Sequence, residues 1–304
     1  MDLIELIESA KASSNLRDLI KSSLKKLSIA LNEYVNALNL SDKYLRLATS
    51  HLIGRGKLFR GLYTYLISIA LNASESKAIT LAVAGELYHT ASLIHDDIID
   101  RSPIRRGIEA VHVKYGVNRA ILAGDLLIVY PNLLLSKLGS KVIELLSLAG
   151  IELCDGESLE LNYNLNNINL DIYNRIAYKK TAALFEYLFK AASVIANKLY
   201  LMDMLGKLGV NVGMAFQYRD DMLDIIGNSK VLGKPVHMDV NKPNLIYVLK
   251  KEYKTSIEDA LKIAMDMIDI KVSEATSIID ELPISARFKE VLKILTYFLK
   301  KRSL

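Results

Sequence analysis

Cysteine, tryptophan and proline are scarce in this chain. Its 304 residues include 1 cysteine, no tryptophan and 5 prolines. The single Cys154 excludes an internal disulfide, and a reducing interior is the default for such a chain. We expect Cys154 to be a small buried apolar residue. Aromatic residues make up only 7 %, and the net charge is a mild +5. We therefore expect no nucleic-acid partner, since stacking platforms and a strongly basic face are missing.

Signals for export or membrane insertion are also missing. The amino terminus carries an acid, Asp2, where a secretory signal needs bases. The longest apolar stretches, 78–94 and 121–138, are interrupted by polar residues such as Glu86 and Asp125. We predict a cytoplasmic protein with no integral membrane segment.

Alternation of period two is nearly absent, whereas apolar residues recur with helical spacing almost throughout. No linker rich in Pro, Gly or Ser divides the chain, and 51 % hydrophobic residues can fill a sizeable core. The pattern predicts one all-α domain over 1–304, a large bundle with buried central helices. We predict helices over 17–37, 59–72, 75–100, 117–138, 141–164, 170–198, 200–226, 244–252, 256–281 and 284–301.

The pattern Asp-Asp-x-x-Asp occurs twice, each time near the end of a predicted helix. The two blocks are Asp96, Asp97 and Asp100, and Asp220, Asp221 and Asp224. Residues four apart share a helix face, so each block crowds like charges that repel one another. Magnesium held by carboxylates and substrate phosphates would relieve this repulsion. The blocks therefore predict a site that holds Mg²⁺ against a diphosphate.

A loop rich in cations follows each aspartate block. The cations are Arg101, Arg105 and Arg106 after the first block, and Lys230, Lys234 and Lys242 after the second. Arginine and lysine would take the phosphate oxygens that the metal does not neutralise. Acid on the helix with base on the adjacent loop supports a diphosphate ligand.

With these flanks in view, the chain resembles the trans-isoprenyl (polyprenyl) diphosphate synthases, the geranylgeranyl diphosphate synthases among them. The resemblance covers roughly residues 50 to 245 and rests on an ordered set of motifs. Besides the aspartate blocks these are Gly56-Lys57-Leu58-Phe59-Arg60, Glu86-Leu87-Tyr88-His89, Arg105-Arg106-Gly107, Ala123-Gly124-Asp125, Lys180-Thr181, Phe216-Gln217 and Gly233-Lys234-Pro235 with Asp239 and Lys242.

The resemblance implies the isoprenoid synthase fold, with a central substrate cavity, and a prenyltransferase acting as a homodimer. Such an enzyme condenses isopentenyl diphosphate head-to-tail with an allylic diphosphate. Ionisation, condensation and elimination follow in turn, with Mg²⁺ and cations stabilising the departing diphosphate. The resemblance implies three Mg²⁺ ions when substrate is bound.

The same resemblance assigns the site residues. All six aspartates are implied to hold metal. The allylic diphosphate is implied to contact Arg105, Lys180, Thr181, Gln217, Lys234 and Lys242. Of these, Lys180, Thr181 and Gln217 have the catalytic role of stabilising the allylic cation with oxygen dipoles. The isopentenyl diphosphate site, metal-free and basic, maps onto Gly56, Lys57, Arg60, His89 and Arg106.

Three residues depart from the family pattern. Leu58 stands where an arginine is usual, so we expect a weaker isopentenyl diphosphate site. Glu157 stands where glutamine is common, which would change the supporting hydrogen bonds. Asn244 replaces a threonine near the lid loop.

Product length should depend on the residues preceding the first aspartates. Ala91 and Ser92, one turn back, are too small to block a growing chain. Tyr88, two turns back and about 12 Å along the helix, is the candidate floor, with Gly85 beyond it offering no second plug. We predict geranylgeranyl diphosphate or a somewhat longer all-trans product.

Two other functions fit parts of the pattern. A terpene cyclase shares the fold and metal chemistry, but it lacks the acceptor-site set and usually alters the second aspartate block. A non-catalytic subunit of a heteromeric prenyltransferase typically loses aspartates, whereas this chain keeps all six.

Overall fold

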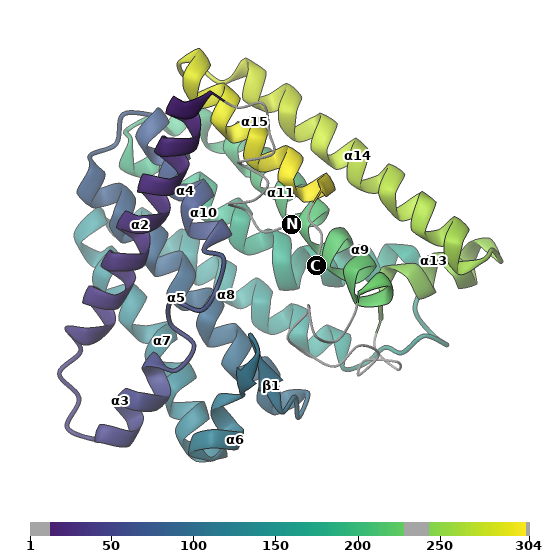
Figure 1. Cartoon of the computed structure of the whole chain (residues 1–304), viewed down its shortest axis with the longest axis horizontal. Coiled ribbons are helices and arrows are strands. Elements are labelled where there is room, and N and C mark those ends of the chain that lie inside the picture. Colours follow the sequence, from purple (N-terminus) through teal and green to yellow (C-terminus); the bar gives the residue numbers. More distant parts are fainter. Residues whose placement is uncertain (1–12, 228–242, 302–304) are drawn as a thin grey trace.

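A computed structural model describes residues 13–227 and 243–301, which form a helical bundle (Figure 1). The first half contains α2 (Ser14–Asn36), α3 (Lys43–Ser50), α4 (Phe59–Ala70), α5 (Glu75–Ile99), α6 (Val111–Tyr115), α7 (Val117–Leu135), η1 (Ser136–Leu138) and α8 (Ser140–Glu160). The second half contains α9 (Leu170–Ala177), η2 (Tyr178–Ala182), α10 (Ala183–Ile195), η3 (Leu199–Leu201), α11 (Met202–Ile226), α13 (Leu245–Tyr253), α14 (Ile257–Glu281) and α15 (Ala286–Lys301). Two short antiparallel strands, β1 (Ile104–Arg105) and β2 (Ile108–Glu109), are the strands of the described chain. The all-α prediction is confirmed.

The centre of the bundle is built from α5, α10 and α11. Helix α5 packs against α4, α7 and α10, while α11 packs against α10 and α14. Helices α5 and α11 each contain 25 residues, and more than half of the residues in each helix are buried. The aspartate blocks end these two central helices, so burial of the helices fixes where the carboxylates lie.

Glycines on α11 allow η2 and α10 to approach closely. A Cβ atom at Gly209 would lie 2.6 Å from the Cα atom of Glu186, and one at Gly213 would lie 2.4 Å from the Cα atom of Ala182. These neighbours are backbone atoms, which cannot swing aside. The close crossing brings the start of α10 next to the helix that carries the second aspartate block.

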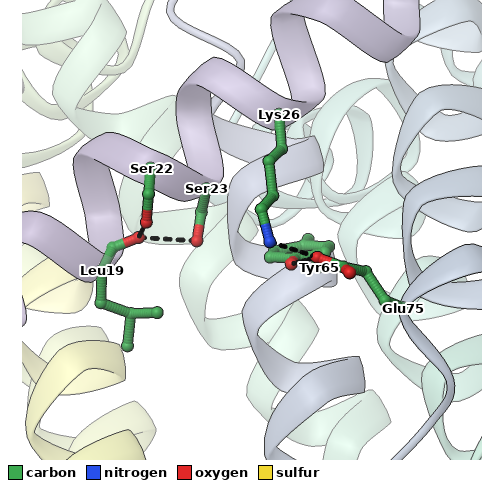
Figure 2. Close-up of polar contacts among 6 residues, drawn as sticks. All are labelled: Leu19, Ser22, Ser23, Lys26, Tyr65 and Glu75. Atoms are coloured by element: carbon green, nitrogen blue, oxygen red, sulfur yellow. Dashed lines mark hydrogen bonds and ion pairs between the residues drawn. The ribbon is translucent and has the colours of Figure 1, made fainter.

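Helix α2 is fastened to the bundle by polar contacts at one end of α5 (Figure 2). Lys26 of α2 forms an ion pair with Glu75, the first residue of α5. The Tyr65 hydroxyl of α4 donates to the same carboxylate at 3.0 Å. The apolar face of α2 is buried at Ile20 and Leu27. These contacts tie α2, α4 and α5 together at the end of α5 opposite the first aspartate block.

Some elements differ from the sequence prediction. The expected continuous helix over 170–198 is divided by η2, a π-helix at Tyr178–Ala182. Apolar spacing predicts a helix but does not distinguish i→i+5 from i→i+4 hydrogen bonding, so it did not reveal this π-helix. Helices α3 and α6, with 8 and 5 residues, were not predicted because they are too short for a periodic signal. Cys154, expected to be buried, is exposed.

One described segment, Val117–Leu138, is long and apolar enough to cross a membrane by length and composition, with a mean hydropathy of 1.5. Its helix, α7, packs against α5 and α3. Pro131 lies inside α7 and removes one backbone donor from it. Length and composition alone are weak evidence for a span, because a core helix passes the same test.

Replacing Gly209 by Ala should destabilise the protein, because the added methyl group meets the backbone of α10. Overpacking of this kind costs roughly 1–3 kcal/mol. Gly150→Ala is the matched control: an added Cβ there lies 3.5 Å from its nearest neighbour, the Tyr88 ring, and helix propensity should add about 0.5–1 kcal/mol. Urea unfolding measures both. Equal stabilities for the two variants would contradict the close crossing.

Candidate active site

The first aspartate block lies at the end of α5, against the β1–β2 hairpin. Asp97 is fully buried. The Arg105 side chain donates from Nε to Asp97 Oδ1 at 2.7 Å, and its Nη2 lies 2.5 Å from the same oxygen. Burial raises the pKa of Asp97, and the bond from Arg105 lowers it. The other oxygen, Asp97 Oδ2, is buried without a hydrogen-bond partner. Asp97 therefore positions Arg105 and has only one oxygen left for another ligand.

Asp96 faces Lys180 of η2 and Glu157 of α8. Burial raises the pKa of Asp96 to about 7, with a further rise from the Glu157 carboxylate and an opposing effect of Lys180. The Lys180 ammonium lies 2.7 Å from Glu157 and 2.5 Å from Glu160. The departure at Glu157 thus replaces a neutral hydrogen-bonding group with an ion-pair partner for the predicted phosphate-binding lysine.

The second block ends α11 and is held in place through Asp221. Its Oδ2 accepts hydrogen bonds from the Tyr173 hydroxyl at 2.8 Å and the Leu245 amide at 2.7 Å, and its Oδ1 accepts one from Gln217 at 2.7 Å. Burial raises the pKa of Asp221 to about 7. Asn244 caps α13 and donates to the Asp221 carbonyl at 3.1 Å. Asp221 thereby connects α9, α11 and α13, while Asp220 and Asp224 on the same helix end are half-buried.

The π-helix η2 links the two blocks. Lys180 lies close enough to Asp96 to lower the pKa of that carboxyl. Its neighbour Thr181 donates to Gln217 Oε1 at 2.6 Å, and Gln217 in turn donates to Asp221. The two aspartate blocks, far apart in sequence, therefore converge on consecutive residues of η2. This is the convergence that a shared diphosphate site requires.

Arginines surround His89, which lies two turns before Asp96 on α5. Arg60 Nη1 lies 3.3 Å from His89 Nε2. Burial, followed by the charges of Arg60, Arg106 and Arg105, holds the pKa of His89 well below its ordinary value. His89 is thus a neutral imidazole among guanidinium groups. A cluster of this kind favours an anion such as a diphosphate.

Each arginine of this cluster has its own support. The Arg60 guanidinium lies 4.8 Å from the ring centroids of both Phe185 and Phe216, as in cation–π pairs. Arg106 donates to the Leu52 carbonyl at 2.9 Å. A Cβ atom at Gly56 would lie 2.7 Å from Arg106 Nη2, so the glycine of the motif makes room for that side chain.

Sequence reasoning missed the acids that balance these cations. Glu86 is buried and accepts a hydrogen bond from the Gly61 amide at 2.7 Å. Burial raises the pKa of Glu86, while Arg60 and Arg106 lower it. Glu160, three residues after Glu157, was also missed as a partner of Lys180. A signal existed for Glu86, which is an acid within the otherwise apolar stretch 78–94.

The remaining predicted residues are placed as follows. Lys57 is exposed just before α4, and Leu58 is buried with a left-handed backbone (φ 51°). Tyr88 and Ala91 are buried in α5, and the Ser92 hydroxyl donates to the His89 carbonyl at 2.9 Å. Lys234 and Lys242 lie outside the described residues. Within 13–227 and 243–301, no group of three or more His, Cys, Asp or Glu side chains forms a metal-binding site by itself.

Known proteins share both sequence and fold with this chain. The profile of a family described as polyprenyl synthetase matches residues 42–282. The chain is 33 % identical to a geranylfarnesyl diphosphate synthase of Aeropyrum pernix, over 84 % of this chain and 93 % of that protein. It is 31 % identical to a geranylgeranyl diphosphate synthase of Sulfolobus acidocaldarius, over 84 % of each.

Solved structures agree with the sequence comparison. A polyprenyl synthase of Caulobacter crescentus, crystallised with calcium and isoprenyl diphosphate, superposes with a TM-score of 0.85 at 27 % identity, covering 95 % of this chain and 97 % of that one. A geranylgeranyl pyrophosphate synthetase of Pyrococcus horikoshii gives a TM-score of 0.83 at 28 % identity, covering 95 % and 99 %. The isoprenoid synthase fold is confirmed.

The buried Asp96 predicts a pH-dependent stability. Its folded-state pKa of about 7 lies above the ordinary 3.8, so folding favours the neutral carboxyl and stability decreases as the pH rises through this window. Asp96→Asn removes the ionisation. In EDTA and without substrate, the variant should gain more in unfolding midpoint at pH 8 than at pH 5.

The control is Asp155→Asn. Lys179 lowers the pKa of Asp155, so this carboxylate is ionised at both pH values and its loss should have the same effect at each. Thermal unfolding followed by circular dichroism measures all three proteins. An Asp96→Asn gain that does not change with pH would contradict the raised pKa.

Proposed function

We propose, from the premise that the chain belongs to the polyprenyl synthetase family, that it condenses isopentenyl diphosphate with an allylic diphosphate to give geranylgeranyl diphosphate or a somewhat longer all-trans chain. The chain is a trans-prenyl diphosphate synthase, and its reported relatives include makers of geranylgeranyl and geranylfarnesyl diphosphate. The observation that carries the site assignment is the convergence of both aspartate blocks on Lys180 and Thr181.

The donor set fits Mg²⁺. The aspartates supply oxygen ligands, the kind this ion prefers, and one buried oxygen of Asp97 has no hydrogen-bond partner. We propose that all six aspartates hold the ions together with the diphosphate, up to three ions in number, Asp97 through its unpartnered oxygen. Asp97 and Asp221 also fix Arg105 and α11. When bound, the ions neutralise negative charge on the diphosphate that leaves.

The allylic substrate would lie with its diphosphate beside Lys180 and Arg105. Lys234 and Lys242 are proposed to add cations from the following loop. The allylic carbon then lies near Thr181 and Gln217, whose oxygens stabilise the cation formed when the diphosphate departs. Their mutual hydrogen bond at 2.6 Å supports this role, because it fixes the dipoles before the reaction begins.

The isopentenyl diphosphate would occupy the basic cluster of Lys57, Arg60, His89 and Arg106, with Gly56 making room. The charges that act on His89 are those of Arg60, Arg106 and Arg105, and Arg60 Nη1 lies 3.3 Å from His89 Nε2. Basic side chains hold the diphosphate there, so it is bound without being activated as a leaving group. The neutral imidazole of His89 donates a hydrogen bond without adding charge.

The test is a product assay. The purified protein is incubated with isopentenyl and farnesyl diphosphates and Mg²⁺, and the dephosphorylated products are separated by chromatography. Prenyl alcohols of twenty or more carbons are expected. Released hydrocarbon would indicate a terpene cyclase, and no turnover would indicate a non-catalytic subunit; the reported relatives, synthases by name, support neither alternative.

Lys180→Met should lower kcat/KM for the allylic substrate by about 10²–10³, the range for loss of one group that stabilises developing charge. The matched control is Lys179→Met, one residue earlier in η2. Lys179 pairs with Glu152 and Asp155 instead, so its loss should leave turnover near wild type. Steady-state kinetics with farnesyl diphosphate measure both. Similar losses in the two variants would contradict a direct role for Lys180.

We also propose that the chain acts in the cytoplasm as a homodimer, joined through α7 and α8. The outer face of these helices exposes large apolar residues: Leu122 at 54 %, Val129 and Leu133 at 63 % each, and Ile151 at 62 %. A contiguous face of this kind is typical of an interface between subunits. A second copy of the chain would cover it symmetrically.

Val129→Glu combined with Leu133→Glu should convert the dimer to a monomer of 34.0 kDa, because two charges would be buried at the interface. Leu199→Glu is the control, an exposed apolar site on η3, which contacts α10 and α11. Sedimentation equilibrium gives the mass of each. A wild-type monomer, or a double variant that remains dimeric, would contradict this interface.

A further inference from the structure

Tyr88 does not lie free at the end of the substrate channel. It is 4 % exposed and belongs to α5, two turns before Asp96. Its hydroxyl donates to Asn132 Oδ1 of α7 at 3.1 Å. Burial raises the pKa of Tyr88, the bond with Asn132 lowers it, and the nearby Cys154 thiol raises it further. The hydroxyl is therefore protonated at any physiological pH and remains a donor to Asn132.

The Tyr88 ring also packs against α8. A Cβ atom at Gly150 of α8 would lie 3.5 Å from Tyr88 Cε1, so the ring lies over bare backbone there. Cys154, one turn further along α8, is exposed although it lies between Gly150 and Glu157 on one helix face. Three helices thus meet at the ring: α5 carries it, α7 holds its hydroxyl and α8 supports its edge.

Further back along α5, at Gly85, the helix packs closely against α10. Leu188 of α10 is fully buried and packs against Gly85, where an added Cβ would lie 2.7 Å from its side chain. Above the ring the wall is small, because Ala91 ends in a methyl group and the Ser92 hydroxyl bonds to its own helix. A chain growing from the aspartates would therefore meet Tyr88 first.

We propose that Asn132 is a specificity-determining residue: by accepting the Tyr88 hydroxyl, it fixes the ring across the channel and sets the length at which elongation stops. This inference rests on the proposed function. An aromatic ring held only by its own rotamer preference could swing aside for the next isoprene unit. A hydrogen bond to a different helix opposes this, because swinging would break the bond and leave a partly buried amide oxygen without the Tyr88 hydroxyl.

The test is the product distribution of four single variants. Asn132→Leu keeps the bulk and removes the acceptor, whereas Asn132→Asp keeps an acceptor oxygen. Tyr88→Phe keeps the ring and removes the donor, and Tyr88→Ala removes both. Asn132→Leu and Tyr88→Phe should each raise the proportion of the next longer product roughly fivefold, the effect of one hydrogen bond. Tyr88→Ala should lengthen the products most, and Asn132→Asp should retain the wild-type distribution.

The double variant Asn132→Leu with Tyr88→Phe separates a shared bond from two independent effects. If the bond is the determinant, the second substitution adds nothing to the first. Asn118→Leu, which changes an exposed asparagine of the same helix, controls for the substitution and should leave the distribution unchanged. Ratios of products come only from folded, active enzyme, so partial unfolding lowers the yield and leaves the ratio intact.

Two outcomes would overturn the proposal: Asn132→Leu with a wild-type distribution, or additive effects in the double variant. Failure of the proposed function looks different, because wild-type protein would then give no prenyl diphosphate at all. If wild-type protein makes prenyl diphosphates and the Asn132 variants make the same product distribution, the synthase assignment stands. Only the role of Asn132 is then removed.

Discussion

The structure depends on stabilising charged side chains at the ends of largely apolar helices, where burial keeps water from solvating the charges. An uncompensated charge in such a place is expensive, so each group has a counter-charge or a set of donors. Asp97 is paired with Arg105, Lys180 with Glu157 and Glu160, and Asp221 with three hydrogen-bond donors. These pairings connect the β1–β2 hairpin, α8, η2, α9 and α13 to the two central helices. The same contacts that make the charges tolerable therefore assemble the site.

The two halves of the site differ in how this charge is balanced. On the aspartate side, acids outnumber the cations beside them, and burial leaves Asp96 and Asp221 with pKa values of about 7. On the His89 side, guanidinium groups predominate and the imidazole is neutral. One side suits cations with a diphosphate, and the other suits a diphosphate alone. With the substrates placed as proposed, that asymmetry ionises one of two similar substrates while the other is kept whole.

Much of this could be predicted from the sequence. The aspartate blocks, their basic loops and the helical periodicity are local patterns, and they indicated both the fold and the chemistry. The partners of those residues are not local. Nothing near Asn132 in the sequence indicates that its amide meets Tyr88, and the pairing of Lys180 with Glu160 depends on how α8 packs against η2. The π-helix was missed for a related reason, since apolar spacing predicts a helix without specifying which hydrogen bonds hold it.

The π-helix at Tyr178–Ala182 has a consequence for how this enzyme can change. Its extra residue sets the angular offset between α9 and α10, so that Lys180 points to the first helix end and Thr181 to the second. Deleting one residue here would return the turn to regular α-helical winding and change which side chains of the segment face the two helix ends. The winding of this turn, and not only the identity of its side chains, therefore determines which groups meet between the aspartate blocks.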